Sequence, residues 1–185
     1  TTRQCLLHPN RNGVVDEATC EAILRDHLGA ERVLWLDEGL LHDHTDGHVD
    51  TIARFIAPGV VACMAPSGFD DPNREVLDTI ARDLGRMSDA AGRRLEVVRI
   101  PSPGLVLDEE GDAMPASHVN FYIANACVAV PIYGTPWDEA AVEALRAGAH
   151  DFINKGRLAR LGPAVARELR DAALRAEQVR MREQL

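Results

Sequence analysis

Residues 48–72 read HVDTIARFIAPGVVACMAPSGFDDP, and this stretch decides the fold. Two apolar runs, Ile52–Ile56 and Val60–Met64, flank an Ala-Pro-Gly turn. Apolar runs of this length, separated by turn residues, are typical of two strands joined in a hairpin. The sequence therefore predicts a β-hairpin that begins just after a His-Val-Asp triplet.

A helix and a further strand are predicted after the hairpin. Asp71 and Pro72 provide a helix start, and the helical pattern runs to about Met87. The apolar run Leu95–Ile100 then predicts another strand. The resulting unit has the order strand, strand, helix, strand.

The same order recurs 70 residues later, where residues 118–136 read HVNFYIANACVAVPIYGTP. Repetition of a strand-rich unit with one helix favours modules set side by side or around an axis, as in a barrel or propeller. A doubly wound sheet would instead place a helix between every pair of strands. The fold class is therefore predicted to be α/β, with the second repeat comprising strands at 121–124 and 127–131 and a helix from Thr135 and Pro136 to about Ala147.

The segment before the repeats predicts a strand, a helix and a strand. Cys5–Leu7 is a short apolar run, followed by Asn and Gly turn residues. Asp16 is placed to cap a helix, and Gly29 stands where that helix would stop. Residues 32–36 are expected to form the strand after it.

The two repeats differ at their ends. After the second helix, the expected closing strand is not evident, and residues 163–185 have the charged, amphipathic pattern of a helix. We therefore expect a modular domain over residues 1–147 and a divergent, mostly helical segment over 148–185. Whether that segment belongs to the native fold is left open.

Composition narrows the classes of partner. The 185-residue chain carries 20 Lys and Arg against 29 Asp and Glu, a formal net charge of -9, which disfavours nucleic acid. Its longest apolar runs are too short to cross a bilayer, so no membrane partner is expected. The four cysteines form no CxxC pair, which favours reduced thiols and a cytoplasmic location.

Ionisable side chains of Asp and His gather in residues 43–50, which read DHTDGHVD and lead into the hairpin. If this segment enters the strand in extended form, His48 and Asp50 project from the same face. A carboxylate accepts two parallel hydrogen bonds from a guanidinium, so Asp50 is suited to anchoring a flat cation. A histidine exchanges protons near neutral pH, so His48 is a candidate acid/base.

Two other interpretations of this loop remain open. The side chains of His42, His44 and His48, with those of Asp43, Asp46 and Asp50, could supply zinc ligands, although no HExxH helix is present. The loop could also be a solvated acidic segment without function. We favour the substrate-binding interpretation and expect no metal.

Four separated blocks carry a resemblance to a known family. They resemble consecutive blocks of agmatine deiminases and bacterial peptidylarginine deiminases, in order and in spacing over about residues 1–147. The blocks are CLLHPNRN at 5–12, VLWL at 33–36, DGHVD at 46–50 with IARF at 52–55, and PASHVNFYIAN at 115–125.

The resemblance implies a five-bladed α/β propeller of the pentein, or guanidine-modifying, type. In that family a Cys thiolate attacks the guanidinium carbon, ammonia leaves, and water releases an N-carbamoyl product, without metal or organic cofactor. The family's histidine falls on His48, its substrate carboxylate on Asp50, and Asp46 is expected to assist substrate binding. Agmatine, on the route to putrescine, is the expected substrate, peptidylarginine is the alternative, and a homo-oligomer is left open.

The chain departs from the family pattern at the nucleophile. The family's Gly-rich block with a His-Cys pair has no match here, and there is no Cys beyond Cys127. We expect Cys5, Cys20, Cys63 and Cys127 to be structural, and the chain to be inactive alone. A non-catalytic guanidinium-binding or interaction module is therefore a second hypothesis.

Several other residues are expected to be structural. His118 and Asn120 repeat the positions of His48 and Asp50, but Asn cannot supply a charge. Trp35, Tyr122 and Trp137 are interpreted as core or interface aromatics.

Overall fold

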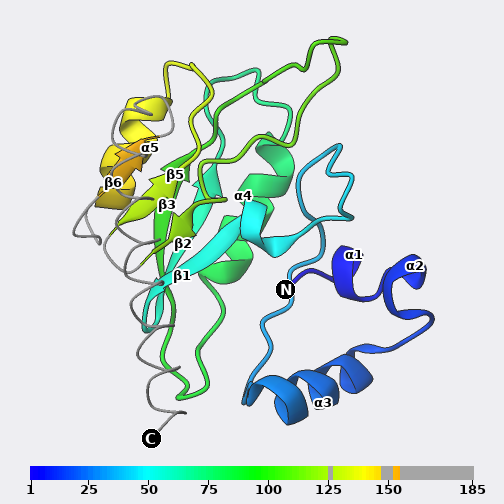
Figure 1. Ribbon diagram of the computed structural model, residues 1–185. Coiled ribbons are helices and arrows are strands. Elements are labelled where there is room, and N and C mark those ends of the chain that lie inside the picture. The colour runs from blue at the N-terminus through cyan, green and yellow to red at the C-terminus, as the bar shows by residue number, and fades with distance from the viewer. Residues whose placement is uncertain (125–126, 147–151, 155–185) are drawn as a thin grey trace, which may run out of the picture.

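The computed structural model describes residues 1–124 and 127–146, together with the backbone of 152–154. Figure 1 shows two small sheets, with the N-terminal helices beside the first of them. The helices of the chain are α1 (Arg3–Leu6), α2 (Pro9–Asn12), α3 (Glu17–Leu28), the 3-10 turn η1 (Val49–Thr51), α4 (Arg74–Leu84) and α5 (Asp138–Arg146). Its strands are β1 (Ala53–Ala57), β2 (Val60–Ala65), β3 (Glu96–Pro101), β4 (Tyr122–Ile123), β5 (Val128–Val130) and β6 (Phe152–Asn154).

The first sheet confirms the predicted hairpin and its following unit. β1 pairs with β2 antiparallel, and β2 pairs with β3 in parallel, with α4 as the connection between them. Residues Val61–Met64 of β2 are all buried, because β2 is the central strand and α4 packs on it. Burial on both faces explains why this strand is a continuous apolar run rather than an alternating one.

The second sheet repeats the first. β4 pairs with β5 antiparallel, β5 pairs with β6 in parallel, and α5 connects them. The prediction that the second unit lacks its closing strand was therefore wrong, because Phe152–Asn154 provides it. Three residues are too few to produce a recognisable apolar run. The helix predicted over 163–185 lies outside the described residues.

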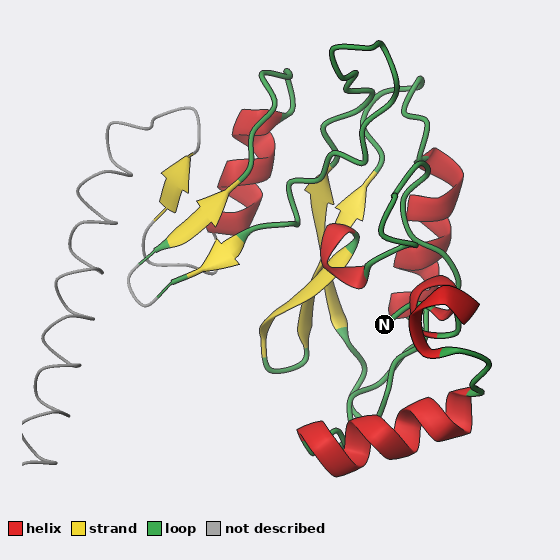
Figure 2. Cartoon of the chain, turned by 45° about the vertical axis from the view of Figure 1, so that its right-hand side comes forward, coloured by secondary structure: helices red, strands yellow, loops and turns green. Residues whose placement is uncertain are grey.

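The two modules share one core. α5 contacts both β3 and β6 and lies between the two sheets (Figure 2). The fully buried side chains of Ile52, Met64, Leu77 and Ile100 belong to the same apolar cluster as those of Val119 and Val130. Direct polar contacts also join the modules, since Ser117 Oγ donates to the carbonyl of Thr51 at 2.5 Å.

The N-terminal segment corrects two predictions. Cys5–Leu7 is not a strand: Thr2 caps the short helix α1, with its Oγ1 accepting from the N–H of Cys5 at 3.0 Å. Residues 32–36 make only one isolated bridge, from Leu36 to Thr2, because the chain turns into α1 directly after Thr2. The helix between Asp16 and Gly29 is confirmed as α3, with both caps as predicted.

The starts of the later helices also fall a little beyond the predicted residues. Asp71 lies in a turn before α4, where its Oδ1 accepts from the N–H of Asn73 at 2.9 Å, so the helix begins at Arg74.

The described helices are all too short or too polar to span a bilayer.

Candidate functional site

The loop that leads to His48 is tied to the N-terminal segment. Thr2 Oγ1 donates to the carbonyl of Gly47 at 2.6 Å, and Gln4 Oε1 accepts from the N–H of Gly39 at 2.9 Å. Gly47 has a φ of 75°, and a Cβ there would lie 2.3 Å from Gln4 Oε1. The left-handed backbone therefore favours glycine at 47, and the two hydrogen bonds tie the loop to residues 2–4.

Asp43 organises the loop from inside. Its Oδ1 accepts from the N–H and Oγ1 of Thr45, and its Oδ2 accepts from the backbone N–H of His48 at 3.0 Å. Burial alone would raise the pKa of the Asp43 carboxyl, but these hydrogen bonds outweigh it and hold the pKa below its ordinary value. Asp43 is therefore a charged acceptor that fixes the backbone of His48.

The segment carrying His48 and Asp50 is not a strand, contrary to the prediction. His48 precedes η1, a 3-10 turn over Val49–Thr51, and Thr51 Oγ1 donates to the carbonyl of His48 at 2.8 Å. The turn nevertheless brings the two side chains together, with His48 Nδ1 3.9 Å from Asp50 Oδ1. Both remain open to solvent, with 35% and 50% of their side chains exposed.

Asp46, the third predicted site residue, contacts a different histidine. Its Oδ1 lies 3.6 Å from His8 Nε2, and its backbone has a φ of 64°. An aspartate tolerates this left-handed conformation better than most residues. The structure thus places His48 beside Asp50, and Asp46 beside the N-terminal segment.

Asp50 opens onto a cavity of about 340 Å³. The cavity is mostly apolar, and Arg54 is its other charged side chain. His48 is not among the residues that line it, so the imidazole reaches Asp50 from outside the cavity. The remaining lining residues are Thr1, Leu34, Leu36, Val49, Ala53, Phe55, Val61 and Leu84.

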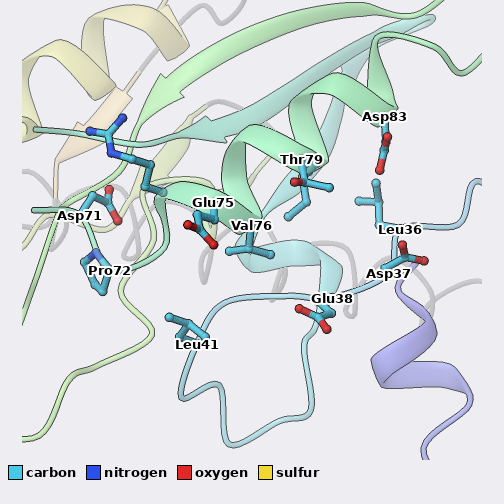
Figure 3. Close-up of a pocket in the computed structure, with 12 residues that line it drawn as sticks. Leu36, Asp37, Glu38, Leu41, Asp71, Pro72, Glu75, Val76, Thr79 and Asp83 are labelled. Atoms are coloured by element: carbon cyan, nitrogen blue, oxygen red, sulfur yellow. The ribbon is translucent and has the colours of Figure 1, made fainter. Parts of the chain in front are cut away.

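A second cavity, of about 610 Å³, lies between α4 and the 36–41 segment (Figure 3). Five carboxylates line it, with Arg74 as the cation. Asp71 already accepts hydrogen bonds from Ser67, Asn73 and Ser102. No motif in the sequence predicted this cavity, whose carboxylates are those of Asp37, Glu38, Asp71, Glu75 and Asp83.

The arginine of the N-terminal NRN triplet reaches the predicted site. An Arg11 guanidinium nitrogen lies 2.7 Å from His48 Nε2 and donates to the carbonyl of Thr45 at 3.2 Å. Sequence reasoning treated residues 10–13 as a turn and missed this contact. The occurrence of Arg11 inside one of the matching blocks was the available signal.

The thiols are placed as structural cysteines. Cys5, Cys20 and Cys63 are buried, and burial raises the pKa of each, that of Cys63 to about 11. For Cys5, burial is the main cause; the Arg11 charge opposes it and those of Asp43 and Asp46 add to it. Buried, protonated thiols are poor nucleophiles, which agrees with the structural role predicted for these three.

His118 is likewise structural, as predicted. It is fully buried, with Nδ1 2.7 Å from the carbonyl of Pro101 and Nε2 3.0 Å from Asp138 Oδ1. Tyr122 and Trp137 are not core aromatics, since they are 71% and 38% exposed. Among the described residues, no three His, Cys, Asp or Glu side chains gather closely enough to hold a metal ion.

Comparison with known proteins gives one consistent result. The sequence profile of the Porphyromonas-type peptidyl-arginine deiminases matches residues 1–152. A Listeria monocytogenes protein named for agmatine deiminase activity is 37% identical over an alignment of 163 positions, and the match covers 79% of this chain and 45% of the relative. The agmatine deiminase of Stutzerimonas stutzeri is 35% identical, covering 79% of this chain and 44% of its own length.

Solved structures agree. The agmatine deiminase of Enterococcus faecalis is 35% identical, with a TM-score of 0.76, over 83% of this chain and 47% of that one. A variant of the C. jejuni agmatine deiminase with its substrate bound gives a TM-score of 0.74 at 27% identity, over 83% of this chain and 45% of that one.

The matches cover only part of each relative. This chain spans slightly less than half the length of the agmatine deiminases that it matches. The matches run through both ββαβ modules and end near the closing strand of the second. The chain belongs to the family of Porphyromonas-type peptidyl-arginine deiminases and agmatine deiminases, and corresponds to part of the family's α/β fold.

Proposed function

We propose that this chain is part of an agmatine deiminase, which converts agmatine to N-carbamoylputrescine and ammonia in putrescine synthesis. The observation that carries the proposal is the placement of His48 beside Asp50, with Asp50 facing a cavity. The relatives named agmatine deiminase support the choice of agmatine. Peptidylarginine, giving citrulline, is the alternative substrate.

In the proposed reaction, a Cys thiolate adds to the guanidinium carbon. The C–N bond to the terminal nitrogen breaks, that nitrogen leaves as ammonia after gaining a proton, and a thiouronium adduct remains. Water then attacks the same carbon and gives up both of its protons as the C–S bond breaks, which returns the thiolate and frees the N-carbamoyl product. His48 transfers these protons, and Asp50 anchors the cation.

The nucleophile of this reaction is proposed to lie outside the chain. The buried thiols of Cys5, Cys20 and Cys63 do not suit the role, and no cysteine follows Cys127. We therefore expect the chain to bind guanidinium compounds at most weakly and to have no turnover alone. We also propose that the whole protein forms the five-bladed propeller and acts in the cytoplasm without metal or cofactor. The divergent segment expected over 148–185 is proposed to begin after β6 instead, because Phe152–Asn154 belongs to the second sheet.

The role of Asp46 in substrate binding also stays a proposal. Its carboxylate faces His8 in this structure, so a substrate that uses Asp46 would have to compete with that pair.

The test is an assay of the full-length gene product for ammonia and N-carbamoylputrescine. D50N, which keeps the shape of the side chain and removes its charge, should lower turnover at least about a hundredfold. D26N removes an exposed carboxylate on α3 and should leave turnover unchanged. A full-length protein that hydrolyses neither agmatine nor peptidylarginine would rule the proposal out.

The second hypothesis, a module that only binds, predicts a different pattern. Calorimetric titration of this chain with agmatine would then show binding that D50N abolishes and D26N preserves, while the full-length protein releases no ammonia. Equal heats for the wild-type and D50N chains would show that Asp50 anchors no cation in this chain.

A further inference from the structure

The guanidinium of Arg11 contacts the Nε2 atom of the His48 imidazole. The arginine extends from α2, which is 37 residues earlier in the chain, and one of its terminal nitrogens lies 2.7 Å from His48 Nε2. The same nitrogen donates to the carbonyl of Thr45 at 3.2 Å. Arg11 is thus held by two acceptors, one of them the candidate acid/base.

This contact defines which nitrogen of His48 carries the hydrogen. A guanidinium can donate hydrogen bonds but cannot accept them, so His48 Nε2 has to be the acceptor. A neutral imidazole has one accepting and one donating nitrogen, which leaves the hydrogen on Nδ1. Nδ1 faces Asp50 Oδ1 at 3.9 Å, where a carboxylate favours an N–H over a lone pair.

The other charged groups near the site do not oppose this assignment. Asp43 contacts the backbone N–H of His48 at 3.0 Å, and Asp46 pairs with His8. Neither contact involves a ring nitrogen of His48. The cation at Nε2 and the anion near Nδ1 therefore act together.

We propose that Arg11 is a positioning residue that sets the tautomer of His48, so that Nδ1 carries the hydrogen and Nε2 carries none. The importance of this tautomer for catalysis rests on the proposed function, because a general base needs a ring nitrogen that carries no hydrogen. The substrate's guanidinium has the same donors as Arg11 and would make the same bond to Nε2 on replacing it. Arg11 thus keeps the imidazole in the form that receives a guanidinium.

Removing the guanidinium should leave the local fold intact. α2 has its own supports, since Asn12 Nδ2 donates to the carbonyl of Leu6 at 3.1 Å and the N–H of Asn10 donates to His8 Nδ1 at 3.3 Å. Neither uses the Arg11 side chain. A change at Arg11 can therefore be read at His48 without loss of the helix.

The experiment is ¹⁵N NMR of the histidine ring nitrogens in this chain, at a pH where imidazoles are neutral. The His48 signals are identified by their absence in H48Q. Wild-type His48 should show a protonated Nδ1 and a bare Nε2. R11M keeps an unbranched side chain but has no donor, so His48 should lose this form and carry its hydrogen on Nε2. R11K keeps a cationic donor, so His48 should retain this form.

R25M is the matched control, because Arg25 is exposed on α3 and no hydrogen bond of its side chain is present in the described part of the chain. Its His48 signals should equal those of the wild type. A wild-type His48 with its hydrogen on Nε2, or an R11M spectrum unchanged from the wild type, would overturn the proposal. Because no substrate is needed, a full-length protein without deiminase activity would refute the proposed function and leave this result standing.

Discussion

His118 Nε2 lies 3.0 Å from Asp138 Oδ1, and the imidazole is completely buried. The pair links the start of the second module to the start of α5, while His118 Nδ1 reaches the carbonyl of Pro101 at the end of β3. The histidine that repeats the position of His48 is thus used to hold the two modules together.

Replacing one member of this pair should destabilise the chain. H118A removes the buried contacts of the imidazole with Asp138 Oδ1 and with the carbonyl of Pro101, and the loss of buried hydrogen bonds costs about 1–3 kcal/mol in the free energy of unfolding. Urea denaturation followed by tryptophan fluorescence would measure it. H27A, on the exposed side of α3, is the control, and equal midpoints for the two variants would contradict the prediction.

Acid should weaken the fold through Asp43 and Asp138. Burial alone would raise the pKa of the Asp138 carboxyl, but its hydrogen bonds outweigh burial and lower that pKa; the donors are Thr135, His118 and the backbone of Gly134 and Tyr133. Hydrogen bonds from Thr45 and His48 lower the pKa of Asp43 in the same way. A carboxyl whose pKa is lowered by folding adds stability that is complete above its unfolded pKa of about 3.9 and is lost as pH falls through its folded pKa.

The measurement is the free energy of unfolding at about pH 7 and at about pH 3.5. The wild-type chain should lose stability between them, and D138N should lose less, because its amide cannot titrate. D26N should follow the wild type. If D138N showed the full wild-type loss, Asp138 would not be one of the titrating groups.

The cysteines should differ in their reaction with iodoacetamide. Cys63 is fully buried with a pKa of about 11, so at about pH 8 about one thiol in a thousand is ionised, and alkylation should require unfolding. Cys127 is only half-buried and should react first. Mass spectrometry of the digested chain gives the order, and early labelling of Cys63 would show that β2 opens in the native state.

The contact between Arg54 and Phe121 should couple the two modules. The guanidinium lies 4.7 Å from the ring centroid and donates to the carbonyl of the same residue. R54M should cost about 1–2 kcal/mol, while R54K keeps a cation and should cost less. Faster hydrogen exchange at β4 in R54M than in R54K would be the local signature, and equal exchange in both would contradict the coupling.

Local patterns predicted the modules well. The Ala57–Gly59 turn between two apolar runs specified the β1–β2 hairpin, and the Asp16 and Gly29 caps bounded α3, because turn and cap chemistry acts over a few residues. The repeat then indicated that the second unit shares the order of the first. β6 was missed because its three residues depend on β5 for their structure.

The site was predicted in part. His48 and Asp50 do lie together, but through η1 rather than along a strand, so the pairing was right and its geometry wrong. Arg11 and Asp138 were not foreseen as partners of the two histidines. Both contacts join residues that are far apart in the chain, 37 and 20 positions, and periodicity carries no information about such pairs.

The close approach of Gly39 and Gly47 has a consequence for mutational tolerance. A methyl group on Gly39 would lie 2.5 Å from the Gly47 Cα, and one on Gly47 would collide with Gln4. The backbones at Gly39 and Gly47 are therefore in close contact, one residue before His48. A saturation library would find these two glycines as intolerant of replacement as His48 and Asp50, although neither glycine has a functional side chain.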